Sequence, residues 1–151
     1  MIHVTGLMNS RYNLLVNIMR SMKINANVLM YGERTDSGLI ICTRDISDSI
    51  QSEIAKTGKM VDDVLVEYDK QLDMLRNMLS VRKSENTWLF DSDNLIDDTS
   101  YIINSLSMHF GGRDGYTVRA EAMIDDRLIT KYDEIDVEIL IRKFYEIIGD
   151  R

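Results

Sequence analysis

The segment NVLMYGERTDSGLIICTR, residues 27–44, decides the fold class of this chain. Two short apolar runs, Val28–Tyr31 and Leu39–Cys42, flank a polar stretch that ends in Gly38. Two such runs around a turn are typical of a β-hairpin. Short apolar runs also occur where a helix ends and a loop begins, so the segment leaves both interpretations open.

A second segment, Tyr116–Tyr132, raises the same question near the other end of the chain. Apolar and small residues alternate along it with polar ones, which is typical of a hairpin. The same residues also allow a helix with four apolar residues facing inward: Val118, Ala122, Met123 and Ile129. The chain is therefore either all-α, or α+β with hairpins at 27–44 and 116–132.

Five other segments carry apolar residues at helical spacing. They are Met8–Lys23, 47–57, 61–80, Asn94–Phe110 and Val137–Ile148. The segment 61–80 has the strongest amphipathic pattern. The segment Asn94–Phe110 has little polar face near its end, which is typical of a central, buried helix. Gly58 is expected to end the second helix, and Gly111 and Gly112 the fourth, because glycine tolerates positive φ.

Length, charge and cysteine content restrict the class of protein. The 151 residues fit a single domain, residues 1–151. A net charge of −7 argues against binding to nucleic acid, which requires cations. The single cysteine, Cys42, lies in an apolar run, so we expect a buried thiol and a reducing compartment. No run is long enough to span a membrane and no signal peptide is evident, so we expect a cytoplasmic protein without membrane contact.

The residues that carry common chemistries are absent or badly spaced. Neither GxxxxGK[ST] nor GxGxxG, the two glycine-rich phosphate-binding motifs, occurs in the chain. The histidines, His3 and His109, lie far from each other and from Cys42 in sequence, which argues against a zinc site. Adjacent acidic pairs such as Asp62–Asp63 are typical of a solvated helix face. We therefore expect no catalytic residue, no cofactor and no metal, and a protein that is not an enzyme.

Three pieces of the chain, in this order, resemble the poxvirus Bcl-2-like family of small helical proteins. Val61–Tyr68 has an acidic pair followed by an apolar helix that carries a tyrosine. Phe110–Gly112 ends the predicted central helix where family members often have Trp-Gly, and Val137–Ile141 has the spacing of the closing helix. The resemblance covers roughly residues 59–148. A composition with 18 isoleucines, 17 aspartates and 4 alanines suits a poxvirus gene.

The resemblance implies an all-α fold, a Bcl-2-like bundle of about seven helices around a central helix. Helices 47–57 and 61–80 would line one side. The implied function is that of a non-enzymatic intracellular viral protein. It would bind host proteins and inhibit apoptosis or innate immune signalling, through NF-κB or interferon-regulatory factors. Host signalling or apoptotic proteins would be its partners, and a homodimer is possible.

Some members of this family bind a partner's amphipathic helix in a surface groove. The corresponding prediction is that four residues of the second and third helices border such a groove. They are Ile50, Ile54, Leu65 and Tyr68. The other interpretation of these residues, from their helical spacing alone, is that all four belong to the core.

Two further functions remain open at this stage. One is that of a small acidic α+β regulatory or chaperone-like protein from a phage or an AT-rich bacterium. The other is that of an enzyme whose site no motif reveals. The strand content of the protein separates the first of these from the helical bundle.

Overall fold

The computed structural model describes residues 1–30, 33, 35, 37–82, 86–112 and 132–149. These residues form four strands: β1 (Ile2–Gly6), β2 (Ala26–Val28), β3 (Gly38–Thr43) and β4 (Thr87–Asp91). They also form six helices: α1 (Tyr12–Ser21), α2 (Ile46–Thr57), α3 (Val61–Ser80), α4 (Ser92–Asp97), α5 (Thr99–Phe110) and α7 (Glu138–Ile148).

The four strands form one parallel sheet in the order β2-β1-β3-β4. Val4 of β1 lies opposite Val28 on one side and Ile40 on the other, and Ile40 lies opposite Trp88 of β4. Strands of parallel sheets are buried on both faces, so they carry continuous apolar runs rather than alternation. The run 39–42 of β3 has this character, since all of its residues are buried.

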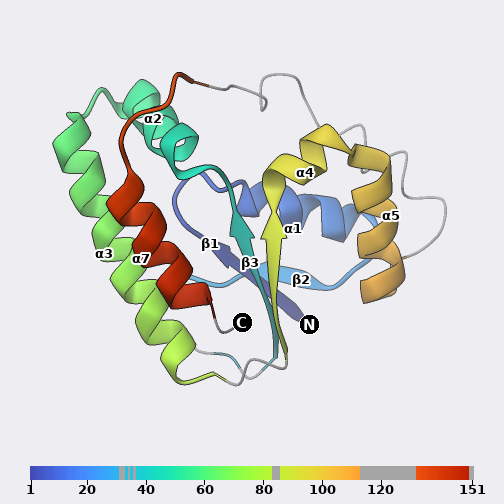
Figure 1. Cartoon of the computed structure of the whole chain (residues 1–151). Helices are drawn as coiled ribbons and strands as arrows, with labels where there is room; N and C mark the ends of the chain where they lie inside the picture. Colours follow the sequence, from blue (N-terminus) through green and yellow to red (C-terminus); the bar gives the residue numbers. More distant parts are fainter. Residues whose placement is uncertain (31–32, 34, 36, 83–85, 113–131, 150–151) are drawn as a thin grey trace.

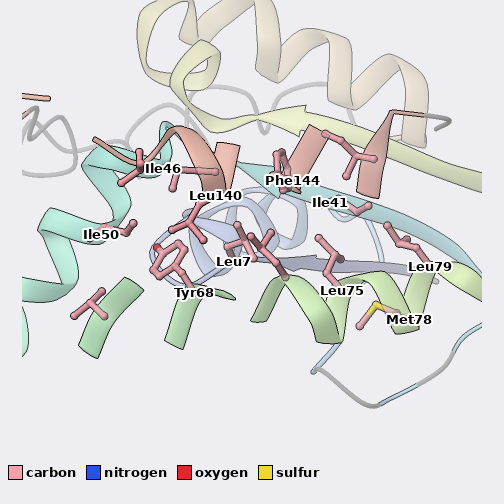
Figure 2. Packing of buried hydrophobic residues seen from close by; sticks show 14 of the residues in the cluster. Leu7, Ile41, Ile46, Ile50, Tyr68, Leu75, Met78, Leu79, Leu140 and Phe144 are labelled. Carbon is pink, nitrogen blue, oxygen red and sulfur yellow. The ribbon is translucent and has the colours of Figure 1, made fainter. Parts of the chain in front are cut away.

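Helices cover both faces of the sheet (Figure 1). Alternate residues of β3 point to opposite faces. Ile40 and Cys42 pack with α1 and α5, whereas Leu39 and Ile41 pack with α2, α3 and α7. Figure 2 shows the second of these cores, in which Tyr68 of α3 and Phe144 of α7 lie close to Ile41 and Leu7. The result is a three-layer α/β/α arrangement.

The predicted all-α bundle is therefore wrong. The protein is α/β, with a parallel sheet between two helical layers. The physical reason is that a strand buried on both faces has no period of two, so its apolar run looks like a piece of buried helix. Two further strands, β1 and β4, went unpredicted, and each has only five residues.

The hairpin expected at 27–44 is not observed either. The segment 27–44 does contain strand residues of β2 and β3, but these two strands do not pair with each other. Each pairs with β1, in parallel, on opposite sides. A turn-like polar stretch thus connects two strands that a third strand separates. The segment 116–132 lies, except for its last residue, outside the residues that the structure describes.

The predicted central helix is divided and lies in an outer layer. Asp98 separates α4 from α5 with a φ of −140°. Tyr101 and Met108 of α5 are 66% and 87% exposed, so one side of the helix faces solvent. The predicted end is confirmed, because Gly111 ends α5 with a φ of 76°.

Helices α2, α3 and α7 begin and end close to their predicted bounds. Asp45 begins α2, where its side chain accepts a hydrogen bond of 2.9 Å from the backbone N–H of Asp48. Gly58 ends that helix with a φ of 70°, as expected. Helix α1 starts at Tyr12, later than the apolar spacing suggested, because the residues before it form the loop described below.

The sequence predicts that the chain does not span a membrane, and the length and hydropathy of its helices test this. Within the described ranges, none of the helices is both long enough and apolar enough to cross a bilayer.

Candidate functional site at the carboxyl edge of the sheet

The direction of winding reverses between β1 and β3. The helix after β1 covers one face of the sheet, and the two helices after β3 cover the other (Figure 1). In open parallel sheets, ligands bind outside the carboxyl ends of the strands at such a reversal. The residues that follow β1, β3 and β4 meet there. We call them the switch-point site: the loop Leu7–Arg11, the pair Arg44–Asp45, and Asp91–Asp93.

The loop Leu7–Arg11 has an unusual backbone. Asn9 and Arg11 have φ angles of 62° and 70°, in the left-handed region. This conformation costs a non-glycine residue roughly 1–2 kcal/mol. Gly6 before the loop allows its tight course, since a Cβ there would lie 2.2 Å from Oγ of Ser10 and 2.6 Å from the carbonyl oxygen of Cys42. Such a loop persists only where its surroundings hold it.

Helix α3 holds the loop at Met8. The hydroxyl of Tyr68 donates a hydrogen bond to the carbonyl oxygen of Met8. The backbone N–H of Met8 donates to Oε1 of Gln71, at 2.9 Å. Burial raises the pKa of Tyr68, so its hydroxyl stays protonated and remains a donor.

Helix α2 and the residue after β3 hold the loop at Asn9. Its side-chain amide donates to Oε2 of Glu53 at 2.8 Å and to the carbonyl oxygen of Ser49 at 3.3 Å. Its amide oxygen accepts from Nζ of Lys56 at 2.7 Å. The guanidinium of Arg44 donates to the backbone carbonyl of Asn9 at 3.3 Å. The side chain of Asn9 thus bonds to α2 and does not cap α1.

Arg11 connects the loop to the start of α4. Its Nη1 lies 2.8 Å from Oδ1 of Asp93 and 3.2 Å from Oγ of Ser92. The hydroxyl of Ser92 donates in turn to the carbonyl oxygen of Thr43, at 2.8 Å. The backbone N–H of Asp45 donates to the other oxygen of Asp93, at 3.3 Å. These bonds tie the ends of β1, β3 and β4 together.

Two guanidinium groups, those of Arg11 and Arg44, lie at this edge among the carboxylates of Asp45, Asp91 and Asp93. Burial alone would raise the pKa of Asp93. The bonds from Arg11 and from the Asp45 N–H, with the charges of Arg11 and Arg44, instead hold that pKa below its usual value. Burial lowers the pKa of Arg44, and the like charge of Arg11 adds to this effect. Both arginines therefore act on the same small region.

The N-terminus of helix α1 lies next to Arg11 and has features that favour an anion. It starts at Tyr12 without a side-chain cap and without an acidic residue in its first turn. The N–H groups and the dipole at the start of a helix favour negative charge.

A cleft of about 250 Å³ adjoins Arg44. Arg44, Asp45 and Asp91 line one wall, at the carboxyl ends of β3 and β4. Residues of α7 line the other, among them Phe144 and Tyr145. Tyr145 is 64% exposed, so its ring is open to a ligand. The cleft therefore joins charged and hydrogen-bonding groups to an aromatic surface.

The four residues predicted to border a groove lie together where α2 packs on α3. Ile50 and Tyr68 are completely buried in the core that Figure 2 shows. Ile54 and Leu65 are partly buried and pack against the same core. These positions give all four a packing role, and their binding of a partner stays a prediction.

Cys42 and the metal-binding residue types add no chemistry to the site. Cys42 is buried, as predicted, and its Sγ donates to the carbonyl oxygen of Ser10 at 3.0 Å. Burial strongly raises its pKa, which disfavours the thiolate that a nucleophile requires. In the part of the chain that the structure describes, no group of three His, Cys, Asp or Glu residues could hold a metal ion.

Sequence reasoning missed the switch-point site, although a signal was present. Gly6 stands between an apolar run and a helical stripe, an arrangement typical of a strand, a tight turn and a helix. Asp91 follows an apolar run directly, and Arg44 follows another after the single residue Thr43. Asp91 caps α4, by accepting a 2.9 Å bond from the N–H of Asp93.

Comparison with known proteins adds no relative. No protein-family model matches the sequence, and no curated protein matches it either.

Proposed function

We propose that the protein binds a phosphorylated small molecule of the nucleotide class at the carboxyl edge of its sheet. The observation that carries this proposal is the loop Leu7–Arg11, which is held in a costly conformation where the winding of the sheet reverses. Backbone strain of this kind clusters at binding and catalytic sites. The reversal is also where open α/β sheets bind nucleotides.

Three groups near the loop suit a phosphate. The N-terminus of α1 and the guanidinium groups of Arg11 and Arg44 lie around it. Guanidinium groups match the geometry of phosphate oxygens and can donate two parallel hydrogen bonds.

The cleft beside Arg44 suits the remainder of a nucleotide. A base could stack on the ring of Tyr145, because aromatic rings favour offset stacking. Asp91 is exposed at the end of β4 and could accept hydrogen bonds from ribose hydroxyls. A site of about 250 Å³ is small, which favours one nucleotide over a dinucleotide.

Titration calorimetry with nucleoside mono-, di- and triphosphates and inorganic pyrophosphate tests this proposal. At least one compound is expected to bind and to raise the melting temperature with concentration. Arg44→Gln should weaken that binding at least about tenfold, since a bond to a charged group is lost. Arg142→Gln removes the same charge from an exposed position on α7 and serves as the control. Lack of binding by every compound at millimolar concentration would contradict the proposal.

The inhibition of innate immune signalling or of apoptosis stays a prediction. It depends on a resemblance whose implied fold, the helical bundle, is contradicted by the parallel sheet. No feature of the described residues favours it over ligand binding. The expectation that the protein is not an enzyme likewise stays a prediction.

A further inference from the structure

The carboxylate of Asp93 lies among donors that would suit a phosphate. One of its oxygens accepts from the guanidinium of Arg11 at 2.8 Å. The other accepts from the backbone N–H of Asp45 at 3.3 Å. The charge of Arg44 acts on the same carboxylate. A side-chain guanidinium, a backbone N–H and a second cation together make an anion-binding arrangement.

The surroundings of Arg11 hold its guanidinium against the carboxylate of Asp93. Its side chain is only 8% exposed, and its backbone is held in the left-handed region at the start of α1. The guanidinium therefore has little room to turn away from Asp93 to a second anion nearby. A phosphate bound at the start of α1 would need the donors that Asp93 now occupies.

We propose that Asp93 fills the phosphate position of the free protein and must be displaced when a phosphorylated ligand binds. This inference rests on the proposed function and adds a means of regulating it. The ion pair keeps the loop ordered without ligand. It also lowers the apparent affinity, because only the fraction of molecules with the pair open can bind.

A purely structural role for Asp93 predicts the opposite effect of neutralising it. If Asp93 only holds the loop in place, its loss loosens the loop and weakens binding. If it competes with the ligand, its loss strengthens binding even though the protein becomes less stable. The sign of the change in affinity separates the two roles.

The test compares Asp93→Asn with the wild type in calorimetric titrations with inorganic pyrophosphate and with the best nucleotide from the panel. The variant is expected to bind at least about fivefold more tightly, the lower end of typical coupling between sites. Asp97→Asn is the matched control, because it removes the same charge from an exposed position on the same helix. It should leave the affinity within about twofold of the wild type. Equal or weaker binding by Asp93→Asn overturns the inference.

A second measurement on the wild type does not depend on a folded variant. The carboxyl ¹³C resonance of Asp93 should shift when pyrophosphate saturates the protein, and that of Asp97 should not. Binding without a shift at Asp93 would overturn the inference and leave the proposed function standing. Absence of any binding to the wild type would overturn both.

Discussion

Two pairs of residues share a left-handed backbone conformation but differ in what holds them in it. Gly58 and Gly111 end α2 and α5 with φ angles of 70° and 76°, and a Cβ at either would meet open space. Asn9 and Arg11 have similar angles without being glycines, and side chains from α2 and α3 and the ends of β3 and β4 hold their loop. The third such non-glycine residue in the described ranges, Lys23, follows the end of α1.

The difference shows at which turn the chain adopts a conformation that lowers its folding stability. A glycine turn needs no support, because glycine adopts positive φ at little cost. The loop Leu7–Arg11 requires contacts from four other elements to remain in place. A protein without a use for this loop could replace it with a cheaper turn, which is why the contrast points to a binding site.

The largest expected effect on this contrast comes from removing Tyr68, the buried support of the loop. Tyr68→Ala should lower the free energy of unfolding by about 3–5 kcal/mol, because it empties a large volume in the core. Tyr68→Phe keeps the ring but leaves the carbonyl of Met8 without that donor, at a cost of about 1–3 kcal/mol. Urea denaturation measures both. A nearly unchanged stability for Tyr68→Ala would instead support the predicted surface role of Tyr68 in partner binding.

An intermediate effect on stability is expected from glycine-to-alanine changes, one before the loop Leu7–Arg11 and one at the end of α2. Gly6→Ala should cost about 1–3 kcal/mol, because its Cβ would overlap Ser10 and the backbone of Cys42. Gly58→Ala should cost about 1 kcal/mol, from the left-handed φ alone, since its Cβ meets open space. Thermal unfolding of the two variants provides the comparison. If Gly58→Ala proves the costlier change, the tight packing of the loop is not as described.

The smallest expected effect concerns pH. The folded-state pKa of Asp93 is depressed, so its ion pair stabilises the protein above the unfolded pKa of about 3.9. That contribution should be lost as pH falls through the folded pKa. The difference in unfolding free energy between the wild type and Asp93→Asn should therefore be constant from about pH 5 to pH 7 and shrink below about pH 4. A difference that grows on acidification would contradict the ion pair with Arg11.

Sequence reasoning was accurate where local periodicity and local turn chemistry decide the structure. The helices at 47–57, 61–80 and 137–148 were expected close to where α2, α3 and α7 lie. Gly58 and Gly111 end helices as predicted, because a single glycine suffices there. The burial of Cys42 followed from its apolar run.

The same reasoning failed where the structure of a segment depends on which strands pair with it. The residues 39–42 look alike whether they form part of a buried helix or of a strand with neighbours on both sides. The two strands of the segment 27–44 pair with Ile2–Gly6, at the start of the chain, and nothing within the segment specifies that partner. The candidate site depends on the same pairing, since Arg11, Arg44 and Asp93 meet only once β1, β3 and β4 lie side by side.

By itself, the sequence determined the long amphipathic helices, the glycine turns and the buried cysteine, because each depends on residues close together in the chain. Only the tertiary structure decided that the short apolar runs form a parallel sheet, that Asn9 and Arg11 take left-handed conformations, and that Asp93 pairs with Arg11. These features depend on contacts between residues tens of positions apart. Such contacts leave no periodic pattern in the sequence. They stabilise the protein only once folding has brought the two partners together.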